Sequence, residues 1–127
     1  DTNVLLRAIV ADDARQARAA VQALDDADIV AVSLQSLCEF AWVLHRQYEA
    51  ARADIAAAIR QLLDTRNVVV NRPAVEAGLA VLQAGGDFAD GIIAYEGNWL
   101  GGDTFVSFDK KAVKLVAQQG QQARLLS

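Results

Sequence analysis

The sequence alternates short runs of apolar residues with longer segments in which apolar residues recur at helical spacing. The short runs at 29–32 (IVAV), 68–70 (VVV) and 104–108 (TFVSF) predict strands, the first of them buried on both faces, and 123–127 predicts an edge strand. Helical spacing and capping residues predict helices over 2–10, 13–24, 33–48, 52–65, 73–83, 87–99 and 109–119. Strands that alternate with helices are typical of an α/β fold, in which helices cover both faces of a parallel sheet.

Length and composition favour one compact domain, residues 1–127. More than half of the residues (54%) are hydrophobic, and no internal repeat or linker interrupts the chain. No apolar run approaches the roughly 20 residues that span a bilayer, so we expect no membrane segment. The only cysteine, Cys38, suits a reducing cytoplasm. A net charge of −4 argues against a protein that binds nucleic acid through its overall charge. It is compatible with local binding of a phosphate by a few Lys and Arg side chains.

The start of the chain departs from the alternating pattern. An α/β domain usually begins with a strand, whereas here Asp1 comes directly before a predicted helix. We therefore expect an apolar first strand to precede Asp1 in the complete fold.

Four acidic residues from distant parts of the chain fall near strand ends or helix starts. Asp1 would follow the first strand, Asp109 follows the run 104–108, Glu39 lies in the second turn of helix 33–48, and Asp90 lies in the first turn of helix 87–99. Functional sites in open α/β sheets form at the carboxyl ends of the strands. Carboxylate oxygens are the ligands that hard divalent cations prefer, so this set predicts a metal site.

The ordered motifs of the chain resemble those of a PIN domain. The motifs are "DTNVLLR" (1–7), "CEFAWVLHRQY" (38–48), "DFADGIIA" (87–94) and "SFDKKA" (107–112), and together they cover almost the whole chain. Within that family the sequence is most similar to the VapC-type toxins of bacterial toxin–antitoxin pairs. The resemblance implies a three-layer α/β/α fold with a central parallel sheet. It also implies an endoribonuclease that depends on Mg²⁺ or Mn²⁺, with one or two ions bound.

The resemblance assigns roles residue by residue. Asp1, Glu39, Asp90 and Asp109 match the catalytic, metal-binding acids of the family, and Ser107 and Asn3 match polar residues that orient those carboxylates. Asp87 is expected to cap its helix and is a candidate fifth acid. Bound cations can activate a water for attack on an RNA phosphodiester, so no protein nucleophile is required. The basic residues beside Asp109 are candidate RNA phosphate contacts: Lys110, Lys111 and Lys114.

Each acid also has a purely structural interpretation. Asp1 and Asp109 suit helix N-caps, Asp90 suits the positive end of a helix dipole, and Glu39 is expected to be half-buried beside Trp42 and Val43. A phosphoaspartate enzyme or a receiver domain also clusters Asp residues. The first usually needs a second Asp two residues after its nucleophile, where this chain has Asn3, and the second needs an adjacent acid pair that "DTN" lacks. A catalytically inactive PIN-like module that binds RNA or protein remains the main alternative.

The resemblance to toxins also implies partners. A ribonuclease in the cytoplasm would damage its own cell, so a cognate antitoxin protein is expected. An Arg side chain of that antitoxin would suit the acidic site, because its planar guanidinium pairs with carboxylates. Helices 33–48 and 52–65 are apolar over more than one face, which favours a homodimer and a groove for an amphipathic antitoxin helix.

Overall fold

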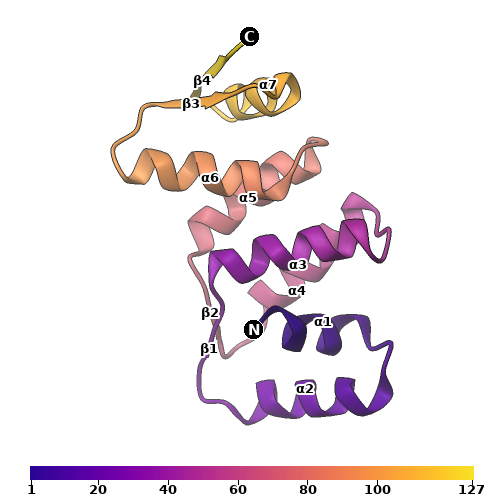
Figure 1. Ribbon diagram of the computed structural model, residues 1–127. Coiled ribbons are helices and arrows are strands. Elements are labelled where there is room, and N and C mark those ends of the chain that lie inside the picture. The colour runs from indigo at the N-terminus through magenta and orange to yellow at the C-terminus, as the bar shows by residue number, and fades with distance from the viewer. The chain divides into compact units, whose positions relative to one another are not determined.

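The structure is a computed structural model that describes residues 1–127 (Figure 1). Seven helices and four short strands form two compact units, Asp1–Val70 (unit 1) and Asn71–Ser127 (unit 2). Each unit contains one two-stranded parallel sheet. The predicted mixture of helices and parallel strands is therefore confirmed, and none of the helices combines the length and the apolarity needed to cross a bilayer.

Unit 1 consists of four helices and the first strand pair. Helix α1 packs on α2 and α3, and α3 also packs on α4 (Figure 1). The centre of the unit is built from large apolar side chains that are almost completely buried, including Leu37, Phe40, Ile55 and Ile59. Its elements are α1 (Thr2–Val10), α2 (Ala14–Asp26), β1 (Val30–Ala31), α3 (Leu34–Arg46), α4 (Arg52–Leu63) and β2 (Val68–Val69).

Helices α2 and α3 begin where polar side chains cap them. The Asp13 carboxylate accepts a hydrogen bond from the Gln16 N–H at 3.0 Å, and the Ser33 hydroxyl accepts one from the Ser36 N–H, also at 3.0 Å. Such caps satisfy N–H groups that have no partner within the helix. They explain why the sequence places these two helix starts correctly.

The strand pair of unit 1 differs from its prediction. Val30 pairs with Val68 and Ala31 pairs with Val69, in parallel register. The prediction that run 29–32 is buried on both faces is wrong, because Ile29 is 66% exposed and Ala31 is exposed as well. Strand β1 is only two residues long and pairs only with the equally short β2, so little of either strand is covered.

Unit 2 consists of three helices and the second strand pair. Helices α5 and α6 pack closely along each other, and α7 contacts α6 and both strands (Figure 1). Phe88, Leu79, Val75 and Val116 are almost completely buried between these helices. The elements are α5 (Arg72–Gln83), α6 (Phe88–Trp99), β3 (Thr104–Ser107), α7 (Lys110–Gln118) and β4 (Gln122–Leu125).

The strands of unit 2 are longer and pair over four residues. Strand β3 runs parallel to β4, from Thr104 opposite Gln122 to Ser107 opposite Leu125. The strand predicted near the end of the chain is thus confirmed. Parallel pairing is confirmed within each unit, whereas one central sheet that joins both pairs stays a prediction.

Candidate active site

Asp1 is the N-cap of α1. Its Oδ1 atom accepts hydrogen bonds from the backbone N–H groups of Asn3 and Val4, at 3.0 and 3.2 Å. Asn3 thus contacts Asp1 through its backbone, and the role predicted for its side chain stays a prediction. Both of these hydrogen bonds use Oδ1 of Asp1, so Oδ2 takes no part in the cap. An exposed carboxylate in this state keeps an oxygen available for a ligand.

Glu39 lies in the second turn of α3, on the side of the helix that faces solvent. The buried stripe of α3 consists of Leu37, Phe40, Ala41 and Leu44, and Glu39 falls outside it. The prediction that Glu39 is half-buried is therefore wrong: the residue is exposed, and Trp42 is itself 57% exposed.

Thr2 is a polar neighbour of Glu39 that the sequence analysis missed. Its Oγ1 donates a hydrogen bond to Glu39 Oε2 at 3.1 Å, across 37 positions of the chain. Because α1 packs on α3, the residue that follows Asp1 reaches the Glu39 carboxylate. The only local signal was a hydroxyl side chain directly after a capping Asp, which by itself predicts no long-range partner.

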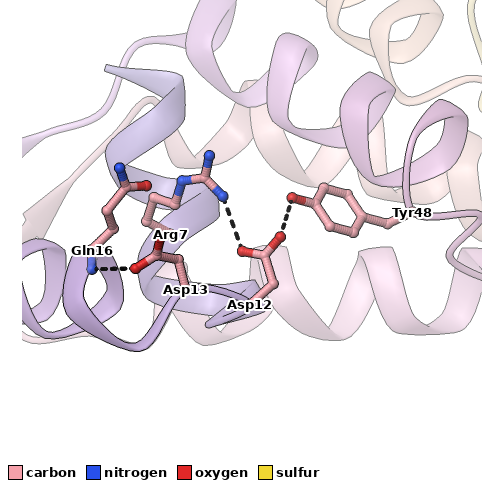
Figure 2. A network of polar contacts seen from close by, with 5 residues as sticks. All are labelled: Arg7, Asp12, Asp13, Gln16 and Tyr48. Carbon is pink, nitrogen blue, oxygen red and sulfur yellow. Dashed lines mark hydrogen bonds and ion pairs between the residues drawn. The ribbon is translucent and has the colours of Figure 1, made fainter.

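A polar network joins the opposite end of α1 to the end of α3 (Figure 2). Arg7 forms an ion pair with Asp12 at 3.0 Å, and the Tyr48 hydroxyl donates to the other oxygen of Asp12, also at 3.0 Å. The Tyr48 hydrogen bond, with a smaller effect of Arg7, lowers the pKa of Asp12, and the same hydrogen bond raises the pKa of Tyr48. Polar contacts thus link α1 to α3, or to the residues that follow α3, near both ends of α1.

Two acids of unit 2 are helix N-caps, as the sequence analysis expected. Asp87 accepts from the Ala89 N–H at 2.9 Å, at the start of α6. Asp109 begins α7, and its Oδ1 accepts from the N–H groups of Lys111 and Ala112 at 2.9 and 3.1 Å. The Ser107 hydroxyl accepts from the Asp109 N–H at 2.9 Å, so it fixes the backbone that carries this carboxylate.

Asp90 lies in the first turn of α6 and is half-buried. Burial is the main cause that raises the pKa of its carboxyl group, and the charges of Asp87 and Asp109 raise it further. Three carboxylates of unit 2 therefore repel one another at a partly dehydrated position, which disfavours the ionised form. A bound cation would reverse this effect.

Glycines bring the helices of unit 2 close together around these acids. A Cβ atom at Gly91 would lie 2.5 Å from the Ala77 carbonyl oxygen of α5. A Cβ at Gly86 would lie 2.5 Å from Leu115 Cδ1 of α7. The residues next to Asp87 and Asp90 in the chain thus leave little room for a side chain, so the first turn of α6 packs directly on α5 and the residue before Asp87 packs directly on α7.

Of the three predicted phosphate contacts, Lys111 has the most definite position. A Cβ at Gly85 would lie 3.8 Å from Lys111 Nζ, so this ammonium group lies over the turn that precedes Asp87. Lys110 and Lys114 are exposed on α7. The position of Lys111 places one positive charge beside the turn at Gly85, two residues before Asp87.

Comparison with known proteins identifies the family. Residues 1–117 match the model of the PIN domain. The chain belongs to the PIN-domain family. Searches of curated proteins and of solved structures gave no match to it. PIN domains are generally nucleases, which agrees with the predicted hydrolysis of phosphodiesters. The finer resemblance to VapC-type toxins is a proposal.

The acids of this PIN domain have the donor chemistry that a divalent cation needs. No three Asp, Glu, His or Cys side chains lie close enough in this structure to form a metal cage. The caps of Asp1 and Asp109 nevertheless use Oδ1 of each carboxylate, and burial, together with the charges of Asp87 and Asp109, disfavours the ionised form of Asp90. Carboxylates with available oxygens and excess negative charge fit Mg²⁺ or Mn²⁺.

Proposed function

We propose that this PIN domain is a metal-dependent endoribonuclease. The observation that carries the proposal is Asp90, a half-buried carboxylate whose pKa is raised by burial and by Asp87 and Asp109. Keeping a charged carboxylate partly buried beside two other acids destabilises the folded protein, and carboxylates with perturbed pKa values are typical of functional sites. Membership in a family of nucleases supplies the reaction class.

The proposed ligands of Mg²⁺ or Mn²⁺ are Asp1, Glu39, Asp90 and Asp109, with one or two ions bound. Asp87 is a proposed additional ligand. When bound, the cation would lower the pKa of a water molecule and stabilise the leaving oxygen of a phosphodiester. The part of Ser107 is to hold the Asp109 backbone, as its 2.9 Å hydrogen bond supports.

Phosphate recognition is proposed for the lysines of α7. Lys111 is the strongest candidate, because its ammonium group lies beside the turn that leads into Asp87. An ammonium group near the acids can hold an RNA phosphate that the carboxylates alone would repel. Lys110 and Lys114 extend the positive charge along the exposed side of the helix.

The biological role that we propose is that of a VapC-type toxin in the cytoplasm, inhibited by a cognate antitoxin and assembled as a homodimer. Support comes from the order of the motifs and from large apolar side chains at the surface. Trp42 is 57% exposed, Trp99 is 80% exposed and Leu100 is 85% exposed. Exposed groups of this size favour protein partners. The three-layer arrangement with one central parallel sheet belongs to the same proposal.

An RNA cleavage assay tests the nuclease proposal. The purified protein is incubated with a mixture of structured and single-stranded RNAs, with Mn²⁺ or with EDTA. We expect cleavage only with Mn²⁺, and we expect Asp109→Asn to abolish it. Asp103→Asn is the matched control, because Asp103 is an exposed acid of the same unit whose carboxylate accepts a hydrogen bond from the hydroxyl of its neighbour Thr104 at 2.9 Å.

Two results would contradict the proposal. Cleavage that survives EDTA would exclude the metal mechanism, and RNA binding without cleavage under all conditions would favour the inactive module. The toxin role has a separate test, in which the protein is co-expressed with the product of its neighbouring gene and analysed by light scattering. A monomer that forms no complex would contradict the proposed homodimer and antitoxin.

A further inference from the structure

We propose that Thr2 is a positioning residue that holds Glu39 in the orientation needed for metal binding. This inference rests on the proposed function, because it takes Glu39 to be a metal ligand. The observation is the hydrogen bond from Thr2 Oγ1 to Glu39 Oε2, at 3.1 Å. It occupies one oxygen of the carboxylate and leaves Oε1 for a cation.

Glu39 needs such a partner because it is exposed. A Glu side chain at a helix surface can adopt many rotamers, and fixing it in one of them costs conformational entropy. Glu39 lies outside the buried stripe of α3, so apolar packing does little to select its rotamer. A hydrogen bond to the charged carboxylate is the restraint that the structure provides.

Thr2 is well suited to supply that restraint. It is the first residue of α1, directly after the Asp1 cap, and it is half-buried. Its branched Cβ restricts χ1 to a small number of rotamers, so the hydroxyl has few positions relative to the helix backbone. The packing of α1 on α3, together with the Arg7–Asp12–Tyr48 network, keeps the two helices in place.

Because Thr2 directly follows Asp1, the start of α1 links the two acids of unit 1. Asp1 fixes the start of α1 through its cap, and Thr2, one peptide bond later, fixes Glu39. Mutating a residue that orients a metal ligand through a hydrogen bond typically lowers the metal affinity or the activity of the protein 10–100-fold. Thr2 therefore acts on the metal through Glu39, without touching the metal or the substrate.

The test compares Mn²⁺ binding and RNA cleavage in variants of the full chain. Thr2→Val keeps the size and removes the donor, Thr2→Ala removes the side chain, and Thr2→Ser keeps the hydroxyl. Thr65→Val is the matched control, because Thr65 also donates its hydroxyl within unit 1, to the Gln61 carbonyl at 2.8 Å. Mn²⁺ affinity is measured from the electron paramagnetic resonance signal of the free ion, and melting curves check the folding of each variant.

We expect Thr2→Val and Thr2→Ala to weaken Mn²⁺ binding about tenfold and to lower kcat, with little change in KM for RNA. Thr2→Ser should restore most of the affinity, and Thr65→Val should match the wild type. The inference is overturned if Thr2→Val binds Mn²⁺ as the wild type does, or if Thr2→Ser binds as weakly as Thr2→Val. Glu39→Gln separates the claim that Glu39 binds the metal from the claim that Thr2 orients Glu39. If Glu39→Gln weakens Mn²⁺ binding and Thr2→Val does not, the proposed function stands and the role of Thr2 fails. A wild-type protein that neither binds Mn²⁺ nor cuts RNA overturns both.

Discussion

The close approach of α5 and α6 makes Gly91→Ala a sharp test of how unit 2 holds Asp90. The added Cβ would lie 2.5 Å from the Ala77 carbonyl oxygen, 2.7 Å from Gly78 Cα and 2.9 Å from the Ala77 carbonyl carbon. All three are backbone atoms, which cannot rotate away. To move from 2.5 Å to an ordinary contact of 3.4 Å, the helices must separate locally by about 0.9 Å.

The energetic cost follows from this displacement. Overpacking of a well-packed site typically destabilises a protein by ~1–3 kcal/mol, and rigid backbone contacts place Gly91→Ala in the upper part of that range. Replacing Gly by Ala within a helix returns ~1 kcal/mol. The free energy of unfolding should therefore fall by ~1–2 kcal/mol, which corresponds to a decrease in Tm of ~4–8 °C for a chain of this size.

Gly97→Ala is the matched control for this experiment. Gly97 lies in the same helix, but a Cβ there would meet no atom within 4 Å outside its own helix. Its Tm should stay equal to that of the wild type or rise by up to ~4 °C. Thermal unfolding followed by circular dichroism gives both values. A Gly91→Ala protein that melts at or above the wild-type temperature, or a Gly97→Ala protein that loses as much, would refute this account of the helix contact.

Two further predictions follow from the titrating groups. Because the pKa of Asp90 is raised, the metal-free wild type loses stability as pH rises above 3.8 through the folded-state pKa. In EDTA, Asp90→Asn should therefore have a higher Tm than the wild type at pH 7 and the same Tm at pH 3.5, and it should lose RNA cleavage. A lower Tm than the wild type at pH 7 would contradict burial and neighbouring charge as the cause of the raised pKa. For Tyr48→Phe, the lowered pKa of Asp12 contributes stability that is lost as pH falls below 3.8, and the raised pKa of Tyr48 contributes stability that is lost as pH rises above 10.0. The Tm difference from the wild type should be largest between these values and shrink at both extremes, and a difference that is independent of pH would exclude the network as its cause.

The helices could be predicted from the sequence because their ends are local features. Ser33, Asp87 and Asp109 each precede an apolar segment, and each caps the helix that follows. Pro73 likewise falls in the first turn of α5, where its missing N–H costs no hydrogen bond. Capping depends on residues within one turn, so a single sequence contains the necessary information.

Burial and long-range contacts could not be predicted in the same way. Ile29 belongs to an apolar run, yet it is 66% exposed, because burial depends on what packs against the strand. Glu39 has apolar neighbours in the chain but lies outside the stripe that α3 buries. Its contact with Thr2 depends on the packing of α1 against α3, which no spacing rule contains.

The central claim is that the carboxylates of this PIN domain bind a catalytic divalent cation. The most direct measurement is an anomalous difference map from crystals of the protein grown with Mn²⁺. We expect an anomalous peak for Mn²⁺ next to carboxylate oxygens of Asp90 and Asp109. The metal–oxygen distances should be about 2.1 Å, as for Mg²⁺ in proteins. A well-ordered map with Mn²⁺ in the crystal and no metal on either carboxylate would contradict the claim.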